Sequence, residues 1–592
     1  THTHTNTHTH THTPIHTHEM CMECRWDVWG RNRDQRGAVL MFPVLGARVL
    51  VSTPIFYVNA SPHVGHLYSV LLADAYARWL RLKGVHKSVW LSTGTDEHGS
   101  KVAAAAAAAN MEPMEYCSTI SRQFSDMCTR FSVFPDRFIR TTDPDHIDTV
   151  HWLWDRLRVT PGLIQPEKYE GWYCVSDESF VPAGRVTDGP KGVKVSAESG
   201  KKVEWLSEDN LMFSLETQEE KLKAWLENGP IIPEERAREV ASIVSAGLHP
   251  LSVTRPTERM SWGIPLNDAP EHSFYVWLDA LANYLTVGRQ AQALWQKEQQ
   301  VSQSRTEELG QEEKEEKKAV EKEEEKEPEE TIPLPDLVHV AGKDILKFHA
   351  IYWPSFLLAA GLPAPKRIAV HAHWTVNGHK MSKSTGNVVC PFALADRFGV
   401  DAVRFSLLLE GGITNDSDFS DSIVVLSFNG ILNDKLGNLF SRTASKSIYR
   451  DNIEKPHKLH AESVDIVLSM DCLRSELELS FERFDFPYGT RAIVTLLSRL
   501  NSYFERMQPW KLRKDPAQEK LADEVVYVTM EGLRIAGIGL LPIIPDGAAS
   551  LLDHLMVPEN KRDLSFMQYG LTPSLFGLSK SILFTKLEAS SP

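Results

Sequence analysis

The hydrophobic pattern of residues 48–96 predicts a strand, a loop, a helix and a second strand. Residues 49–51 and 87–93 are short apolar runs of the kind that form buried strands. Between them, residues 65–83 place apolar and aromatic side chains near helical spacing, and Gly84 supplies a helix stop. This order is a βαβ unit, so we expect an α/β, Rossmann-type doubly wound parallel sheet.

The pattern changes beyond residue 422, where it becomes purely helical. Long amphipathic stretches occupy residues 423–449, 461–480, 488–507 and 522–541. No strand pattern interrupts them. We therefore expect an all-α helical bundle after the α/β part.

Composition narrows the class of protein. The 592 residues carry seven cysteines, too few for a disulfide scaffold, and no apolar run long enough to span a membrane. The net charge is −14, which by itself disfavours a nucleic-acid partner. However, residues 297–330 hold 14 acidic and 7 basic residues and so contribute half of that charge. We interpret this segment as a solvated insertion, either disordered or a charged helix, so the acidic total does not exclude RNA.

The first 47 residues lack a core-forming pattern. Thr and His alternate over residues 1–18, which include seven histidines and no apolar face. Residues 25–48 contain five arginines and two aspartates, a weak likeness to an organelle presequence. An unstructured basic arm explains this stretch equally well.

Two motifs carry candidate chemistry. His63 and His66 flank Gly65 where the first loop enters the first helix, and a helix N-terminus suits phosphate. Lys380 and Lys383, separated by Met and Ser, form a cationic loop able to neutralise a departing pyrophosphate. Taken singly, a capping turn and a solvated loop explain them as well.

In this order and at this separation, the two motifs resemble the signatures of class I aminoacyl-tRNA synthetases. Five further segments are similar to methionyl-tRNA synthetases, most of all to the bacterial-like mitochondrial form. They are TPIFYVN at 53–59, TGTDEHG at 93–99, SWGIP at 261–265, YVWLDA at 275–280 and GKDILKFH at 342–349. The resemblance runs from about residue 48 to about residue 571 and is broken mainly by the acidic insertion.

The resemblance implies a methionine–tRNA ligase that forms methionyl-adenylate and pyrophosphate from methionine and Mg²⁺-bound ATP, then charges tRNA(Met). It implies that one set of residues lines the methionine pocket: Ile55, Tyr57, Trp277, Ala280, Tyr284, Phe348 and His349. Asp96 matches the carboxylate that faces the substrate ammonium. An aromatic cage suits the polarisable thioether of methionine. Without the resemblance, core packing would explain these aromatic residues.

The resemblance also assigns the nucleotide and RNA contacts. ATP would be bound by His63, Gly65, His66, Lys343, Asp344, Lys380 and Lys383, with the two histidines and the two loop lysines catalytic. Asn438, Arg442 and Trp510 match the anticodon readers. An aromatic face with Arg and Asn beside it is how single-stranded RNA bases are commonly bound.

The same resemblance gives seven expected segments. They are a disordered, presequence-like region (1–47), a first Rossmann catalytic half (48–161), a connective insert (162–242), a second catalytic half with the acidic insertion (243–374), the loop of Lys380 and Lys383 with a stem-contact region (375–422), a helical anticodon-binding domain (423–571) and a C-terminal tail (572–592).

The insert departs from family members that bind zinc through repeated Cys-x2-Cys pairs. Asp177 stands where the second cysteine after Cys174 would be, and no second pair follows. One thiolate cannot build a tetrahedral site, so we expect no structural zinc and no other metal site in the protein.

Three alternatives stay open at this stage: another class I synthetase, a synthetase-like RNA-binding protein without catalysis, and a nucleotidyltransferase that uses no tRNA. The resemblance favours the mitochondrial matrix over the cytoplasm. We expect no membrane segment, and the lack of a recognisable C-terminal dimerisation module favours a monomer.

Overall fold

A parallel sheet lies at the centre of the protein, as the sequence predicts. Its spatial order is β10-β15-β14-β1-β3, with β2 and β4 also paired to β3. Its strands are β1 (Val49–Ser52), β2 (Phe56–Tyr57), β3 (Val89–Asp96), β4 (Arg137–Arg140), β10 (Ile231–Ile232), β14 (Asp336–Gly342) and β15 (Arg367–His371). The strand order reverses between β1 and β14, which is the topological switch point of a doubly wound fold.

The computed structural model describes nine stretches of the chain. They are residues 48–85, 89–174, 179–181, 183–197, 200–311, 334–381, 386–450, 453–571 and 582–588. The N-terminal segment 1–47 and Lys383 therefore lie outside the described residues.

Alternate residues of β1 feed two different cores. Val49 and Val51 pack in a core with α2 (Val64–Leu80) and α4 (Pro113–Arg130), whereas Leu50 packs in a second core with α5 (Pro144–Arg158) and α8 (Val276–Gln311). Because successive side chains of a strand point to opposite faces, a strand covered by helices on both sides must be apolar throughout. This explains the unbroken apolar run at 49–51.

The helix predicted at 65–83 is found with small shifts. α2 continues into one wider turn at Arg81–Val85, and Gly84 at φ 89° ends it. The second predicted strand is found from Val89, the first described residue after a gap at 86–88, and it extends to Asp96, because Thr95 and Asp96 pair with β2 despite their polarity. That extension brings Asp96 to the carboxyl edge of the sheet.

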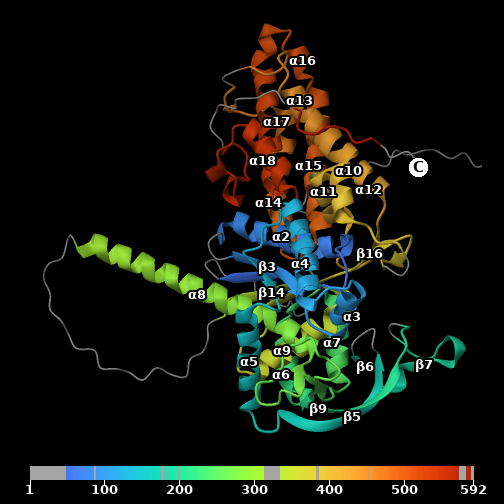
Figure 1. The fold of residues 1–592 in the computed structure, drawn as a ribbon. Helices are drawn as coiled ribbons and strands as arrows, with labels where there is room; N and C mark the ends of the chain where they lie inside the picture. The colour runs from blue at the N-terminus through green and yellow to red at the C-terminus, as the bar shows by residue number, and fades with distance from the viewer. Residues whose placement is uncertain are drawn as a thin grey trace, which may run out of the picture. The chain divides into compact units, whose positions relative to one another are not determined.

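A second, antiparallel sheet projects from the region of the connective insert (Figure 1). Its long hairpin pairs β5 (Ile164–Cys174) with β9 (Glu204–Phe213), flanked by β6 (Ser179–Val181) and β11 (Leu251–Ser252). Smaller strands and helices complete the α/β part: α3 (Ser100–Ala108), α6 (Glu219–Leu226), α7 (Glu234–Ser245), β7 (Val186–Asp188), β8 (Lys194–Ser196), β12 (Thr254–Pro256), β13 (His272–Phe274), α9 (Trp353–Ala359), β16 (Trp374–Val376), β17 (His379–Lys380), α10 (Pro391–Phe398), α11 (Val400–Glu410) and β18 (Ser417–Asp418).

The C-terminal part is all helical, as predicted. Its main helices are α14 (Ala461–Phe481), α15 (Phe486–Met507), α17 (Glu519–Leu540) and α18 (Pro545–His554), shown in orange and red in Figure 1. The single helix expected at 423–449 is instead α12 (Asp421–Ser427), a wider π-helical stretch at Phe428–Gly437 and α13 (Asn438–Thr443). Asn429 in that stretch exchanges two hydrogen bonds with the backbone of Leu587, a contact that local periodicity does not reveal.

The acidic insertion is helical where it begins. α8 runs without a break to Gln311, while residues 312–333 lie outside the described part of the chain. Over the described stretches, no helix combines the length and apolar character needed to cross a membrane.

A buried arginine joins the helical part to α2. Arg404 of α11 is fully buried and bonds to Asp74 of α2 at 2.7 Å. It also donates to the carbonyl oxygens of Phe131 and Ile543, at 2.8 and 2.9 Å. Four segments far apart in the sequence thus share one guanidinium, whose donors are satisfied away from water.

We predict that Arg404→Met lowers the free energy of unfolding by about 3–5 kcal/mol, because the buried Asp74 carboxylate then keeps only Arg78, at 2.9 Å, and the carbonyl oxygens of Phe131 and Ile543 lose their donor. Calorimetric unfolding checks this. Arg130→Met is the matched control, since the Arg130–Asp396 pair lies on the surface and such pairs contribute at most about 1 kcal/mol. Equal losses in the two variants would contradict the assignment.

Candidate active site

The predicted site residues collect at the carboxyl edge of the parallel sheet, on both sides of the switch point. The loop after β1 and β2 leads into α2 through His63, and the loop after β14 carries Lys343 and Asp344. β1 and β14 are hydrogen-bonded neighbours. Ligands of doubly wound folds bind in the crevice formed where two such loops diverge.

His63 and His66 form a reciprocal cap on α2. The Gly65 backbone N–H donates to His63 Nδ1 at 3.0 Å, and the His63 N–H donates to His66 Nδ1 at 3.2 Å. The two rings stack with centroids 3.8 Å apart. A Cβ on Gly65 would lie 2.8 Å from the ring of His63, so only glycine permits this arrangement.

Hydrogen bonding fixes the tautomer of both histidines. Each Nδ1 accepts a backbone N–H, so the ring proton of a neutral imidazole must sit on Nε2. Burial, together with the positive charge of Lys380, lowers the pKa of His63 to about 4. Burial also lowers the pKa of His66 well below its ordinary value. At neutral pH the pair therefore offers two neutral Nε2–H donors at a helix N-terminus.

The cationic loop lies against the loop after β14. Lys380 Nζ is 2.9 Å from Asp344 Oδ2, and His373 Nε2 is 3.1 Å from Asp344 Oδ1. Although burial by itself raises the pKa of Asp344, the hydrogen bond from His373 and the charge of Lys380 hold that pKa well below its usual range. Asp344 is thus ionised and holds Lys380 close to the histidine pair.

Two backbone contacts fix the base of this loop. The amide of Asn387 donates to the carbonyl of Lys380 at 3.2 Å, and the N–H of Val64 donates to the carbonyl of Val389 at 3.1 Å. The second bond joins the first turn of α2 to the far arm of the loop. The two sequence motifs, more than 300 residues apart, are therefore physically connected.

The predicted methionine-pocket residues form two close aromatic pairs. The rings of Trp277 and Phe348 stack with centroids 3.6 Å apart at an interplanar angle of 10°. The hydroxyl of Tyr284 lies 2.7 Å from His349 Nε2. Ala280, one turn along α8 from Trp277, is buried, and Ile55 is partly buried against the same core.

The Tyr284–His349 pair is neutral. His349 Nδ1 lies 2.9 Å from the Ile345 carbonyl, which can only accept, so Nδ1 carries the proton and Nε2 accepts from Tyr284. Burial lowers the pKa of His349 to about 4 and raises the pKa of Tyr284. This wall of the site favours an uncharged side chain.

Asp96 stands beside the aromatic residues at the end of β3. It is paired in parallel register with Tyr57 of β2, so the two side chains lie on the same face of the sheet. Asp96 is 9% exposed. A carboxylate at this edge can bind an ammonium group close to an aromatic wall.

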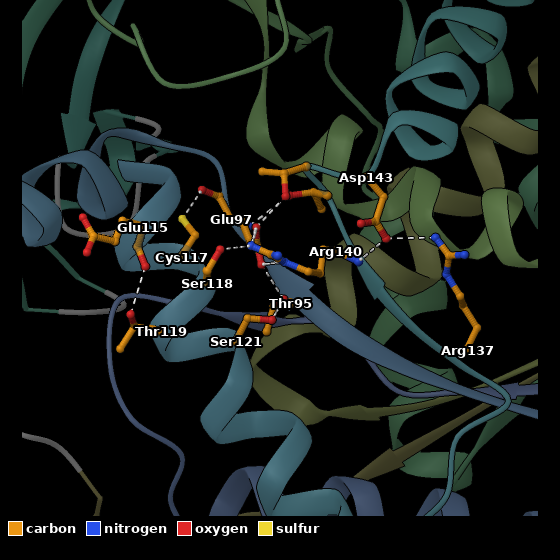
Figure 2. A network of polar contacts seen from close by, with 12 residues as sticks. Thr95, Glu97, Glu115, Cys117, Ser118, Thr119, Ser121, Arg137, Arg140 and Asp143 are labelled. Atoms are coloured by element: carbon orange, nitrogen blue, oxygen red, sulfur yellow. Dashed lines mark hydrogen bonds and ion pairs between the residues drawn. The ribbon is translucent and has the colours of Figure 1, made fainter. Parts of the chain in front are cut away.

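The residue after Asp96 is anchored by a dense polar network (Figure 2). Glu97 is fully buried and takes a bidentate ion pair from Arg140, with contacts of 2.7 and 2.9 Å. Thr95 and Thr142 donate to the two carboxylate oxygens, at 2.8 and 2.7 Å. Because both oxygens are satisfied, the backbone at the end of β3 is held in one position.

Two of the three predicted anticodon readers lie together. The guanidinium of Arg442 is 5.4 Å from the ring centre of Trp510 and 2.6 Å from Glu505 Oε1. Asn438, one turn earlier on the same helix, bonds to Asp434 at 3.4 Å. Within the described part of the chain Asn438 makes no hydrogen bond or ring contact with Arg442 or Trp510, although all three side chains are partly or fully exposed.

Sequence reasoning missed several polar residues around the site, of which Glu97 and Asp279 are buried. Asp416 pairs with Lys343 at 2.7 Å, His373 supports Asp344, and Glu97 and Asp279 anchor the walls of the pocket. Glu97 and Asp279 lie in the segments 93–99 and 275–280 that carry the resemblance, but no role was predicted for either. A carboxylate that stands next to apolar or aromatic residues in such a segment is the signal that could have found them.

Comparison with known proteins gives a consistent result. A family model described as tRNA synthetases class I (M) matches residues 49–444. The mitochondrial methionine–tRNA ligase of Homo sapiens is 37% identical over 558 residues, covering 90% of this chain and 87% of that protein. The corresponding protein of Xenopus laevis is 36% identical over 565 residues, covering 91% and 93%.

A solved structure agrees along almost its whole length. The Mycobacterium tuberculosis methionyl-tRNA synthetase in complex with methionyl-adenylate superimposes with a TM-score of 0.79 at 34% identity, covering 90% of this chain and 99% of that one. With the sheet order, the capped histidine pair and the lysine loop described above, these matches show that the chain belongs to the class I tRNA synthetases of the methionine type.

Proposed function

We propose that this protein is a methionine–tRNA ligase that activates methionine with ATP and transfers it to tRNA(Met). The observation that carries the proposal is the meeting, at one edge of the sheet, of a neutral aromatic pocket, the Asp96 carboxylate and the histidine cap of α2. The first can take a thioether side chain, the second an ammonium and the third a phosphate.

Methionine would be recognised from both ends. Asp96 binds the ammonium group, while Trp277, Phe348 and the Tyr284–His349 pair surround the side chain. Because that pair is neutral and buried, a charged side chain would lose its hydration without a counter-charge. The pocket therefore selects a neutral, polarisable side chain of matching length.

ATP would bind across the switch point as its Mg²⁺ complex. The two Nε2–H groups of His63 and His66 donate to phosphate oxygens, and the N-terminus of α2 adds its partial positive charge. The methionine carboxylate then attacks the α-phosphorus in line, which gives methionyl-adenylate and pyrophosphate. No covalent enzyme intermediate is required, so positioning and charge stabilisation supply the catalysis.

Lys380 and Lys383 would stabilise the charge that develops on the departing pyrophosphate. Lys380 is paired with Asp344, and Lys343 with Asp416. Lys380 and Lys343 are both at least partly exposed, so a polyphosphate that enters between the two loops could bind them. A triphosphate would compete with those carboxylates for the same cations.

The RNA step would use the helical part. Arg442 and Trp510 present a cation and an indole side by side, a surface on which an unstacked base can stack. Asn438 supplies an amide one turn away. The 3′-terminal ribose hydroxyl of the bound tRNA then attacks the carbonyl of the adenylate.

We further propose that the connective insert needs no zinc. Cys174 is buried in a small apolar cluster with Val181 and Val203, and Asp177 lies outside the described residues. Among the described residues no group of three or more potential ligands could hold a metal ion. The monomeric state remains a prediction, and the relatives support action in the mitochondrion.

We predict methionine-dependent exchange of pyrophosphate into ATP, because adenylate formation is reversible and the pocket selects a neutral thioether. The assay is run with each of the twenty amino acids and then with charging of mitochondrial and cytosolic tRNA pools. Exchange driven by leucine or cysteine but not methionine would identify another class I synthetase. Binding of tRNA without any exchange would identify an inactive RNA-binding relative.

We predict that Lys380→Ala and Lys383→Ala each slow pyrophosphate exchange by about 10²-fold or more, because each removes a cation from the leaving group. The KM for methionine should change little. Lys366→Ala is the control, since this exposed lysine precedes β15 at the opposite, amino edge of the sheet. An effect confined to methionine affinity would contradict the phosphate role.

We predict that Trp510→Ala weakens charging of tRNA while pyrophosphate exchange stays near the wild-type rate. Loss of base stacking costs about 1–3 kcal/mol, which appears as a higher KM for tRNA. Trp205→Ala, at an exposed tryptophan of the β5–β9 hairpin, serves as the comparison. A parallel fall of charging and exchange in Trp510→Ala would contradict the anticodon role.

A further inference from the structure

We infer that Asp279, held by His98 and His146, is a positioning residue that fixes the methionine pocket relative to the ammonium-binding carboxylate. The inference rests on the proposed function and deepens it. None of the three residues is among those proposed to contact methionine or ATP.

Asp279 bridges two elements that carry opposite sides of the pocket. It lies in the first turns of α8, between Trp277 and Ala280, both predicted to contact the methionine side chain. His98 lies two residues after Asp96, at the end of β3. The 2.7 Å bond between His98 Nδ1 and Asp279 Oδ2 therefore ties the ammonium side directly to the thioether side.

A second histidine binds the other oxygen of the Asp279 carboxylate. His146 Nε2 is 2.8 Å from Asp279 Oδ1, and His146 Nδ1 is 3.0 Å from the hydroxyl oxygen of Thr286. The Thr286 hydroxyl, which also lies 3.2 Å from the Ala282 carbonyl oxygen, is therefore the outer hydrogen-bond partner of His146. Asp279 of α8 is thus hydrogen-bonded to His98, just after β3, and to His146 of α5. The other ring nitrogen of His146 lies against Thr286, which is again on α8.

The side chains of this hydrogen-bonded network are buried. His98 is 6% exposed, Asp279 1% and His146 not at all. Burial works to raise the pKa of Asp279, but the two histidines hold it at about 2. Asp279 is therefore an ionised carboxylate that can only accept, and both histidines must present N–H groups to it.

The strand end is also held from its other side. Glu97, between Asp96 and His98, is clamped by Arg140 as Figure 2 shows, and its carbonyl accepts from the Trp262 indole at 2.6 Å. Since the end of β3 is fixed in this way, loss of the Asp279 bonds would release the first turns of α8 rather than the strand. Trp277 and Ala280 would then shift relative to Asp96.

This asymmetry gives a selective kinetic signature. Methionine contacts both Asp96 and α8, whereas ATP contacts α2 and the loops after β14 and β17. A small displacement of α8 therefore weakens methionine binding and leaves ATP binding intact. A general loss of folding would instead weaken the binding of methionine and ATP alike, or would reduce only the fraction of active enzyme.

The test uses Asp279→Asn in the full chain, with steady-state pyrophosphate exchange. The amide keeps the shape but turns an N–H toward one histidine, and loss of a hydrogen bond to a charged group weakens binding by about tenfold or more. We expect the KM for methionine to rise by about that factor while the KM for ATP stays within about twofold. Methionine titration calorimetry should show the same weakening without ATP.

Thr286→Val is the milder variant in case Asp279→Asn does not fold. It removes only the outer hydrogen-bond partner of His146, and we expect a rise of about threefold in the methionine KM with no change for ATP. The matched control is Glu531→Gln, which disturbs a fully buried ion pair with Arg534 in α17, far along the chain from the pocket. It should lower thermal stability and leave the methionine KM unchanged.

The outcomes distinguish failure of the positioning role of Asp279 from failure of the proposed ligase function. Equal changes of both KM values, or an unchanged methionine KM in folded Asp279→Asn and in Thr286→Val, would overturn the positioning role alone. A wild-type chain with no methionine-dependent exchange would overturn the proposed function, and the inference with it. Selective weakening of methionine supports both.

Discussion

The active site depends on one constraint, the reversal of strand order between β1 and β14 in an all-parallel sheet. Because β1 and β14 are hydrogen-bonded neighbours whose following loops leave in opposite directions, the edge between them opens without breaking the sheet. α2 begins on one side of this opening and the loop of Lys343 and Asp344 on the other. The histidine cap, the lysine loop and the aromatic pocket all take their positions from this edge.

Buried histidines and buried carboxylates have different roles in the molecule. At the site, His63, His66 and His349 have depressed pKa values because burial disfavours the imidazolium, so they act as neutral donors or acceptors. Away from the proposed substrate contacts, two buried carboxylates are fully bonded: Arg140 pairs with both oxygens of Glu97, and two histidines hold the pKa of Asp279 at about 2. Such fully bonded carboxylates are costly to bury but define one geometry, which suits a catalyst that relies on positioning.

The part of the protein proposed to form the adenylate and the part proposed to bind tRNA are packed against each other. α2 presents its N-terminus to the phosphates, and further along its length Asp74 meets Arg404 of α11, which also bonds to the backbone of the helical part. The apolar core that covers one face of the sheet extends into the helical bundle as well. The proposed adenylate site and the helices proposed to bind the anticodon are thus joined by one continuous apolar core.

The amino-acid sequence by itself determined the order of elements and the helices α14, α15 and α17, and its motifs marked His63, His66 and Lys380 as candidate phosphate contacts. These depend on apolar periodicity and on short local signals, which a single segment carries. Only the tertiary structure decided the end of β3 at Asp96, the interruption of the helix near Asn429, the pairing of Lys380 with Asp344 and the bridge from His98 to Asp279. Each of these contacts joins residues that are distant in the chain or polar within an apolar pattern, so its energy exists only after the sheet and its helices have packed.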